Sequence, residues 1–184
     1  MYYFPEPGVV NTEKALELAI KRAEEANIEY IVISSSTGET AAKLKELNPK
    51  QKIICVTQQA GFNGPGETDM NMEMREKLES IGVKVLCTTH GFAGIDRALR
   101  FKFNGVYPAE IMASTLRIFG QGMKVAIEVS FMALDAALIP HGKPVIAMGG
   151  THKGVDTAII LTPAHSFNFF DTSIREIICM PGGI

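Results

Sequence analysis

The 184-residue sequence has no tryptophan, only three cysteines and no excess of either charge. Its 18 lysines and arginines against 20 aspartates and glutamates give a formal net charge of -2, and no basic run indicates a nucleic-acid-binding surface. No apolar run approaches the ~20 residues of a membrane span, and the chain does not open with a signal-peptide pattern. The sequence therefore predicts a cytoplasmic protein whose partners are small molecules or copies of itself, with no nucleic acid and no membrane.

The three cysteines also exclude two common kinds of covalent or metal-bound framework. Cys55, Cys87 and Cys179 lie far apart, each inside an apolar run, which is typical of buried, reduced thiols. There is no CxxC pair, and no cysteine lies near a histidine pair at zinc-ligand spacing. We therefore expect neither a disulfide framework nor a metal site.

Apolar patterns of helical and strand spacing alternate along the chain. The pattern predicts helices over 12–26, 40–47, 67–81, 108–119 and 121–139, and strands over 28–34, 52–57, 83–88, 145–148, 157–161 and 176–180. The loop 149–156 is too short for a helical crossover, so the strands on either side of it should pair antiparallel. Between 89 and 107 the pattern weakens, and this segment is interpreted as a mobile insertion.

Strands that alternate with helices predict an α/β fold with right-handed crossovers. We expect a single domain over 1–184, a three-layer α/β/α sandwich. Its sheet should be mostly parallel, with an antiparallel hairpin near the C-terminus.

The most informative segment is the turn that follows the strand 28–34. It is rich in hydroxyl groups and leads directly into a helix, whose first N–H groups and dipole favour an anion. The alternative is a set of ordinary helix caps with no ligand. One cap needs one hydroxyl, so the turn predicts a phosphate site made of Ser34, Ser35, Ser36, Thr37, Gly38, Glu39 and Thr40.

Other loops at the carboxyl ends of the predicted strands should line the same crevice, where ligands of open α/β sheets bind. Their glycines, amides and aromatic rings suit a flat heterocycle, although ordinary loop chemistry explains them equally well. The candidates are Thr57, Gln58, Gly61, Phe62, Thr89, His90, Gly91, Gly149, Gly150 and Thr151.

Two features outside this crevice have simpler interpretations. Lys124, Glu128 and Asp135 share one side of a predicted helix and are interpreted as a solvated or subunit-facing stripe. The aromatic run 167–170 indicates a contact between copies of the chain, with a loop folded onto the sheet as the alternative.

The segment SSTGET over 35–40 resembles the loop with which flavodoxins hold the phosphate of flavin mononucleotide (FMN). In flavodoxins, however, that loop follows the first strand with no helix before it. The resemblance therefore extends to the motif and not to the order of elements.

A second resemblance covers about two thirds of the chain. The segments VISSSTGETA (32–41), LNP (47–49) and IICVT (53–57), followed by HGKPVIAMGG (141–150) and DTAIIL (156–161), are similar to the carboxyl-terminal domain of pyruvate kinase. In that kinase the equivalent turn binds a sugar phosphate effector. The catalytic barrel is a separate domain without a counterpart in this sequence, so the resemblance implies no kinase activity.

The resemblance is expected to be nearest to free-standing, largely archaeal proteins of this fold, for which it implies bound FMN. The sequence thus predicts an FMN-binding protein, with a flavin-dependent oxidoreductase as the activity that FMN would permit. The alternative is a non-catalytic sensor or regulatory domain that binds a sugar phosphate or nucleotide. No residue is identified as catalytic.

Overall fold

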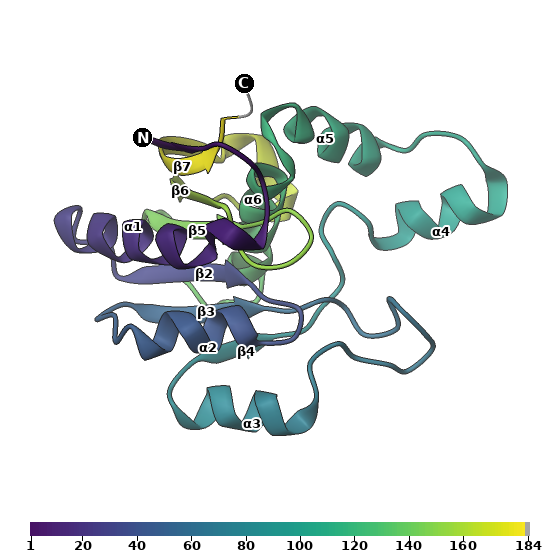
Figure 1. Cartoon of the computed structure of the whole chain (residues 1–184). Coiled ribbons are helices and arrows are strands. Elements are labelled where there is room, and N and C mark those ends of the chain that lie inside the picture. Colours follow the sequence, from purple (N-terminus) through teal and green to yellow (C-terminus); the bar gives the residue numbers. More distant parts are fainter. Residues whose placement is uncertain (183–184) are drawn as a thin grey trace.

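The apolar strands of the sequence form one sheet, which is the middle layer of the fold (Figure 1). The computed structural model describes residues 1–182. The strand order is β1-β7-β6-β5-β2-β3-β4. The strands are β1 (Tyr2–Phe4), β2 (Tyr30–Ser34), β3 (Lys52–Val56), β4 (Lys84–Leu86), β5 (Val145–Gly149), β6 (Thr157–Thr162) and β7 (Ser173–Pro181).

Most neighbouring strands run parallel, as predicted. β2 lies between β3 and β5 and is parallel to both, β4 extends the sheet beyond β3, and β1 pairs parallel with β7. β6 runs antiparallel to β5 and to β7, so the hairpin expected near the C-terminus is confirmed. The sequence did not predict β1, which has only three residues and takes its register from β7.

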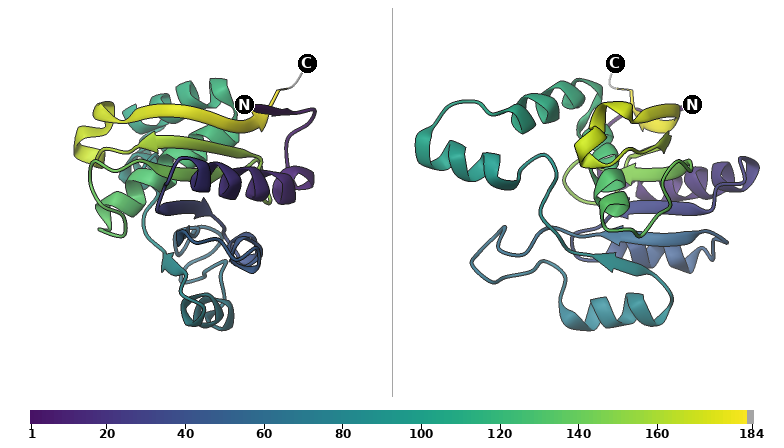
Figure 2. Two further views of the ribbon diagram at one scale, coloured as in Figure 1. Left: turned by 90° about the vertical axis from the view of Figure 1, so that its left-hand side faces the viewer. Right: turned by 180° about the vertical axis from the view of Figure 1, so that it is seen from behind.

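Helices cover both faces of the sheet, which confirms the α/β sandwich (Figure 2). Because successive strand residues point to opposite faces, Ile31 and Ile33 pack on the side of α1, α2 and α3, while Val32 packs on the side of α6. The helices are α1 (Thr12–Glu25), α2 (Glu39–Glu46), α3 (Met72–Ser80), α4 (Gly94–Phe103), α5 (Pro108–Leu116) and α6 (Gln121–Asp135). Short 3-10 turns span Val9–Asn11, Arg117–Phe119 and Ser166–Asp171.

Two predicted segments differ from the structure. α3 begins at Met72 and not at residue 67, because the Asn71 side chain caps it by accepting a hydrogen bond from the Met74 N–H at 2.8 Å. The segment 89–107, interpreted as an irregular insertion, contains the ten-residue helix α4. α4 buries no residue. The prediction missed it although Ile95, Ala98 and Leu99 recur at helical spacing, because the glycines and basic residues of the segment favoured a loop.

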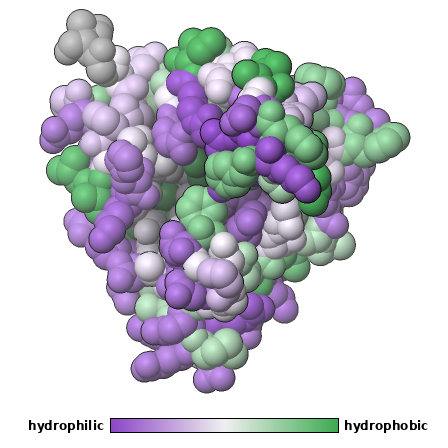
Figure 3. Space-filling model, turned by 90° about the vertical axis from the view of Figure 1, so that its right-hand side faces the viewer, coloured by the Kyte–Doolittle hydropathy of each residue, from purple (hydrophilic) through white to green (hydrophobic). Residues whose placement is uncertain are grey.

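α4 and α5 form an arm, residues 94–119, that projects from the sandwich (Figures 1 and 2). Arg100 pairs with Glu110 at 2.7 Å, and Asp96 accepts a hydrogen bond from the Ala109 N–H at 3.0 Å, so the two helices are tied to each other. Seen from the right-hand side of Figure 1, apolar side chains gather on the upper half of the molecule, over the arm, while the lower half is more polar (Figure 3).

Within residues 1–182, no helix is both long enough and apolar enough to cross a bilayer.

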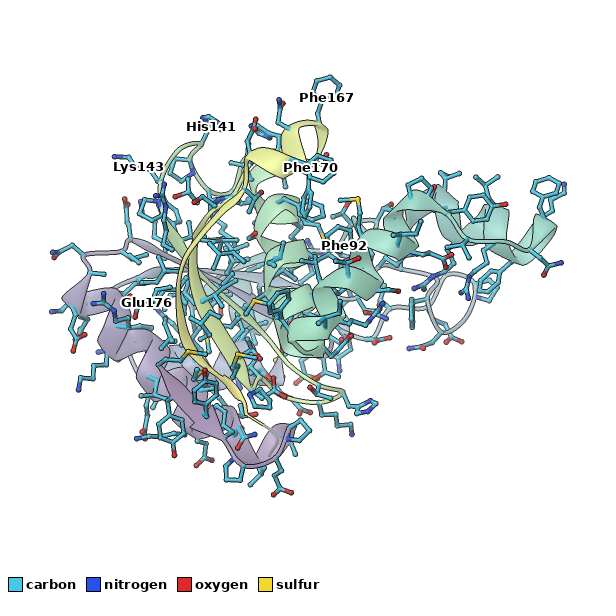
Figure 4. The ribbon with its side chains drawn as sticks, turned by 90° about the horizontal axis from the view of Figure 1, so that it is seen from above. Phe92, His141, Lys143, Phe167, Phe170 and Glu176 are labelled. Carbon is cyan, nitrogen blue, oxygen red and sulfur yellow. The ribbon has the colours of Figure 1, made fainter. Side chains whose placement is uncertain are left out.

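The aromatic run near the C-terminus divides between core and surface. Phe169 packs edge-on against Phe92 and Phe131, with ring centroids 5.4 and 5.5 Å apart. Phe167 and Phe170 are 95% and 88% exposed, and Phe167 points away from the molecule in Figure 4. One ring is thus folded onto the protein, and two are free on the surface. Self-association through them stays a prediction.

Candidate functional site

The sheet reverses its direction of growth between β2 and β5, and this point defines the candidate site. From β2 the chain passes through α2 to β3 on one face, whereas β5, on the other side of β2, is reached through α6 on the opposite face. α2 and α6 both begin at the carboxyl edge of these strands, on opposite faces. Ligands of open α/β sheets bind in the crevice at such a point.

The turn between β2 and α2 is held from within by its own serine. The Ser35 N–H donates to the Val56 carbonyl at 3.0 Å, and the Ser35 hydroxyl accepts a hydrogen bond from the Thr40 N–H at 3.2 Å. Both residues are buried. The Ser35 hydroxyl therefore shapes the turn, and Thr40 contributes its N–H to the same bond.

Three other positions of the turn are exposed and could contact a ligand, whereas Gly38 is buried. Ser36, Thr37 and Glu39 are exposed. Within residues 1–182, the N–H groups of these three residues and of Gly38 donate to no acceptor in the chain. Four main-chain donors at a helix start suit a phosphate. The Glu39 side chain is negative and would repel a phosphate, so this residue can contribute only its main-chain N–H.

Gly38 has a packing role that the sequence did not indicate. Its φ is +90°, and an added Cβ would lie 2.6 Å from Met74 Cγ and 3.0 Å from Leu78 Cδ1 of α3. A side chain at position 38 would therefore overlap with α3.

Three other predicted glycines also make close contacts inside the protein. A Cβ on Gly91 would lie 2.0 Å from the Phe131 ring, one on Gly149 would lie 2.3 Å from the Gly122 carbonyl oxygen, and one on Gly150 would lie 2.1 Å from the Gly154 carbonyl oxygen. These glycines are needed for the packing of the loops and of α6. Gly61 differs, because it is exposed and has a φ of +78° with open space around it.

The remaining predicted residues occupy the same edge with different exposures. Thr57 is buried and donates its hydroxyl to the Gln58 carbonyl at 2.8 Å, while Gln58 is half-buried. Thr89 is exposed. The Thr151 N–H donates to Asp156 Oδ2 at 3.2 Å, so this main-chain donor is already used.

The structure brings the loops after β3 and β4 into direct contact. The rings of Phe62 and His90 lie 6.0 Å apart, and the Arg97 guanidinium lies 5.0 Å from the Phe62 ring centroid. The His90 N–H donates to Gln59 Oε1 at 3.1 Å. Burial lowers the pKa of His90 below its usual 6.5, with the positive charges of Lys124 and Arg97 acting in the same direction against Glu128 and Asp69. A neutral imidazole can both donate and accept a hydrogen bond.

Lys124 and Glu128 of α6 form a buried ion pair beside this cluster. Glu128 also accepts a hydrogen bond from the Phe92 N–H at 2.9 Å, and the Lys124 ammonium lies 5.6 Å from the Phe92 ring centroid. The prediction of a solvated or subunit-facing stripe is therefore wrong for these two residues. A lysine and a glutamate four apart on an otherwise apolar helix were the signal for a buried pair.

Asp156 is a second buried carboxylate at this edge, and the sequence analysis did not select it. It accepts hydrogen bonds from the Gly8 N–H at 2.9 Å and the Thr157 hydroxyl at 2.9 Å, in addition to the Thr151 N–H. Because one of its partners, Gly8, lies 148 residues away in the sequence, a local pattern could not reveal this arrangement. It ties the N-terminal segment to the loop after β5.

The thiols follow the predicted burial in two of three cases. Burial raises the pKa of Cys55 and of Cys179 to about 12, which keeps both protonated. Cys87 is only half-buried and donates to the Gln58 carbonyl, with 3.4 Å between sulfur and oxygen. The described cysteines are free, as expected.

The opposite edge of the sheet carries a different polar group. His141 and His165 stack with ring centroids 5.6 Å apart, and His165 Nδ1 lies 2.8 Å from Asp135 Oδ1. A hollow of about 450 Å³ beside them contains none of the predicted site residues. No group of three or more potential metal ligands was found in the part of the chain that the structure describes.

Comparison with known proteins gives one family and several solved structures. The family model described as the alpha/beta domain of pyruvate kinase matches residues 13–161. A pyruvate kinase from Cryptosporidium parvum is 20% identical, with a TM-score of 0.45 over 86% of this chain and 23% of that one. The same parasite's kinase in complex with ADP is 20% identical, with a TM-score of 0.43 over 85% of this chain and 24% of that one. The chain thus spans about a quarter of the length of these kinases.

Proposed function

The chain belongs to the family of the pyruvate kinase alpha/beta domain, and from this premise we propose that it binds FMN at the carboxyl edge of β2 and β5. The phosphate would lie on the turn 34–40. The flavin ring would lie among the loops after β3, β4 and β5.

The observation that carries this proposal is the set of free main-chain donors at the start of α2. The N–H groups of 36–39 have no acceptor within residues 1–182, and the exposed hydroxyls of Ser36 and Thr37 lie on the same turn. These donors need no lysine to hold a phosphate, which agrees with a chain of net negative charge. Because the turn lies where the sheet reverses its direction of growth, a ligand on this turn would extend over the neighbouring loops.

The loops offer the groups that a flavin ring would need. Phe62 and His90 present aromatic rings, and the amides of Gln58 and Gln59 can bond to the polar edge of a heterocycle. A bound flavin would supply hydride transfer, so an oxidoreductase activity is the reaction class that we propose. The chain's own part would be to orient the ring and, at His90, to hold a neutral imidazole beside it.

The spectrum of the purified protein is the first test. We expect absorption near ~450 nm from bound flavin or, for flavin-free protein, quenching of FMN fluorescence and a higher melting temperature on addition of FMN. FMN should bind more tightly than riboflavin, which lacks the phosphate. Equal affinity for the two would place the phosphate elsewhere.

A single substitution separates the phosphate site from a plain helix cap. Ser36→Asp adds a negative charge at an exposed position without a side-chain partner, so folding should change little. The carboxylate would repel a phosphate, and FMN affinity should fall by roughly 100-fold while riboflavin affinity stays the same. The matched control is Asn71→Asp, which adds the same charge at the start of α3 and keeps a side-chain oxygen to cap it.

The results of this test also decide between the two ligand classes. If Ser36→Asp leaves FMN affinity unchanged while the protein stays folded, the turn is only a cap and the proposal is wrong. If the protein binds no flavin but is stabilised by a sugar phosphate or a nucleotide in a thermal-shift panel, and Ser36→Asp abolishes that effect, the non-catalytic alternative is correct.

A further inference from the structure

One of the six arginines of the chain differs from the other five in the partners of its side chain. Five of them have a side-chain oxygen as partner, whereas the guanidinium of Arg97 has neither a carboxylate nor another hydrogen-bond acceptor within residues 1–182. Arg97 is nevertheless half-buried. The five partners are Glu176 for Arg22, Glu79 for Arg75, Glu110 for Arg100, Gln121 for Arg117 and Thr162 for Arg175.

The place of Arg97 explains how it can be held without such a partner. It lies in the first turn of α4, directly after the loop that carries His90, and its guanidinium is positioned on the Phe62 ring at 5.0 Å. Stacking on an aromatic ring fixes a guanidinium plane while leaving its N–H groups free. The carboxylate that precedes it, Asp96, is used by the Ala109 N–H of α5.

The charges around this position favour an anion that comes from outside the chain. Arg97 and Lys124 are both close enough to His90 to lower its pKa, and the nearest buried carboxylate, Glu128, is already paired with Lys124 and with the Phe92 N–H. Asp69, the other acidic group near His90, accepts a hydrogen bond from the Asn63 side chain at 2.6 Å. Arg97 is left as the cation without a counter-ion.

We infer that Arg97 binds the carboxylate of a small organic acid, which lies against the rings of Phe62 and His90. This inference deepens the proposed function and rests on it, because the acid would be the second ligand of the crevice and the substrate class of the flavin. A guanidinium offers two parallel N–H donors that match the two oxygens of a carboxylate. The neighbouring rings supply an apolar surface for the rest of the acid.

Benzoate and its neutral analogue benzamide test the inference, since they differ in charge and hardly in shape. Calorimetric titration of the folded protein, with and without FMN, should give tighter binding of benzoate than of benzamide. In Arg97→Gln the affinity for benzoate should fall by about 10- to 100-fold, the loss of a charge-assisted bidentate contact. Arg75→Gln, which removes the same charge from an exposed pair on α3, is the control and should leave benzoate binding unchanged.

Other results overturn the inference. Absence of benzoate binding, equal binding of benzoate and benzamide, or unchanged benzoate affinity in Arg97→Gln would each exclude a carboxylate site at Arg97. If Arg97→Gln weakens the binding of FMN but not of riboflavin, Arg97 belongs to the flavin phosphate. If the protein binds no flavin, the proposed function fails, yet titration of the flavin-free protein with benzoate still decides the role of Arg97.

Discussion

The sandwich and the arm of this protein contain two helices that differ completely in burial, α6 and α4. α6, with 15 residues, buries twelve of them, whereas α4, with ten residues, buries none. α6 lies against the sheet and against Phe92, while α4 is tied to α5 through Arg100–Glu110 and touches the loop after β3 through Arg97 on Phe62.

This difference in burial predicts that the sandwich determines the stability of the protein and that the arm chiefly affects binding. Burial of apolar area supplies most of the free energy of folding, so the sandwich determines whether the chain folds. The arm adds little buried surface but carries Arg97, which lies at the carboxyl edge of the sheet. Substitutions in the sandwich should therefore change the free energy of unfolding, and substitutions in the arm should chiefly change binding.

The largest effect is expected where α6 meets β5. Gly149→Ala places a methyl group 2.3 Å from the Gly122 carbonyl oxygen and 2.7 Å from the Ala126 nitrogen, both backbone atoms that can move only with the helix. The free energy of unfolding should fall by more than about 4 kcal/mol, as measured by chemical denaturation. Gly142→Ala is the control, because it adds a methyl group in open space at a φ of +75° and should cost only about 1 kcal/mol. Similar costs at both positions would contradict the overlap argument.

The next effect concerns the buried ion pair of the sandwich. Lys124→Met leaves the Glu128 carboxylate buried without its cation, and the protein should lose roughly 3 kcal/mol of stability. Glu128→Gln in the same chain should restore a large part of this loss, because an amide oxygen can still accept the hydrogen bond from the Phe92 N–H. Thermal or denaturant unfolding of the two variants measures both values, and no rescue by the second substitution would show that the charge was not the cause.

A smaller effect should appear in the pH dependence of stability through His90. Its pKa in the folded protein lies below 6.5, so the unfolded chain takes up a proton first as the pH falls. This contribution is therefore fully present above pH 6.5 and is lost as the pH falls through the lowered pKa of the folded state. His90→Gln should flatten this part of the curve in denaturation experiments between pH 7.5 and about 5. Titration of the His90 ring protons by NMR with a pKa above 6.5 would contradict the prediction.

The smallest effect is expected in the arm. Ile95 and Phe101 of α4 are 76% and 72% exposed, and replacing either with serine should change the free energy of unfolding by no more than about 0.5 kcal/mol. Equilibrium denaturation of the single variants measures this. A loss as large as that of Lys124→Met would show that the arm contributes to the folded core or is covered by another copy of the chain.

The central strands of the sandwich could be predicted from the sequence, whereas the elements at its borders could not. The β-branched run that includes Ile31, Val32 and Ile33 predicted a strand covered on both faces, and the short loop before β6 predicted the antiparallel hairpin, because both depend on local pattern and loop length. α4 was missed although Ile95, Ala98 and Leu99 have helical spacing, because the glycines and basic residues around them are also typical of a loop. The three-residue strand β1 could not be predicted from its own residues, because it forms only by pairing with β7 near the other end of the chain.

The candidate site, too, could be predicted from the sequence only in part. The hydroxyl-rich turn 34–40 can be found from the sequence, since a strand, a polar turn and a helix follow one another. Its internal arrangement could not be found, because the role of Gly38 depends on Met74 and Leu78 of α3. Arg97 gave no signal either, since only the fold brings it onto Phe62.

By itself, the sequence determined the class of the fold, the parallel core strands and the position of the polar turn at a helix start, for which we propose anion binding. These features follow from side-chain periodicity and from the local chemistry of a helix start. Only the tertiary structure decided which residues share the carboxyl edge of the sheet, why its glycines are needed and which arginine side chain lacks a partner within residues 1–182. Such properties depend on distances between segments that are remote in the chain, and those distances are fixed when the layers pack.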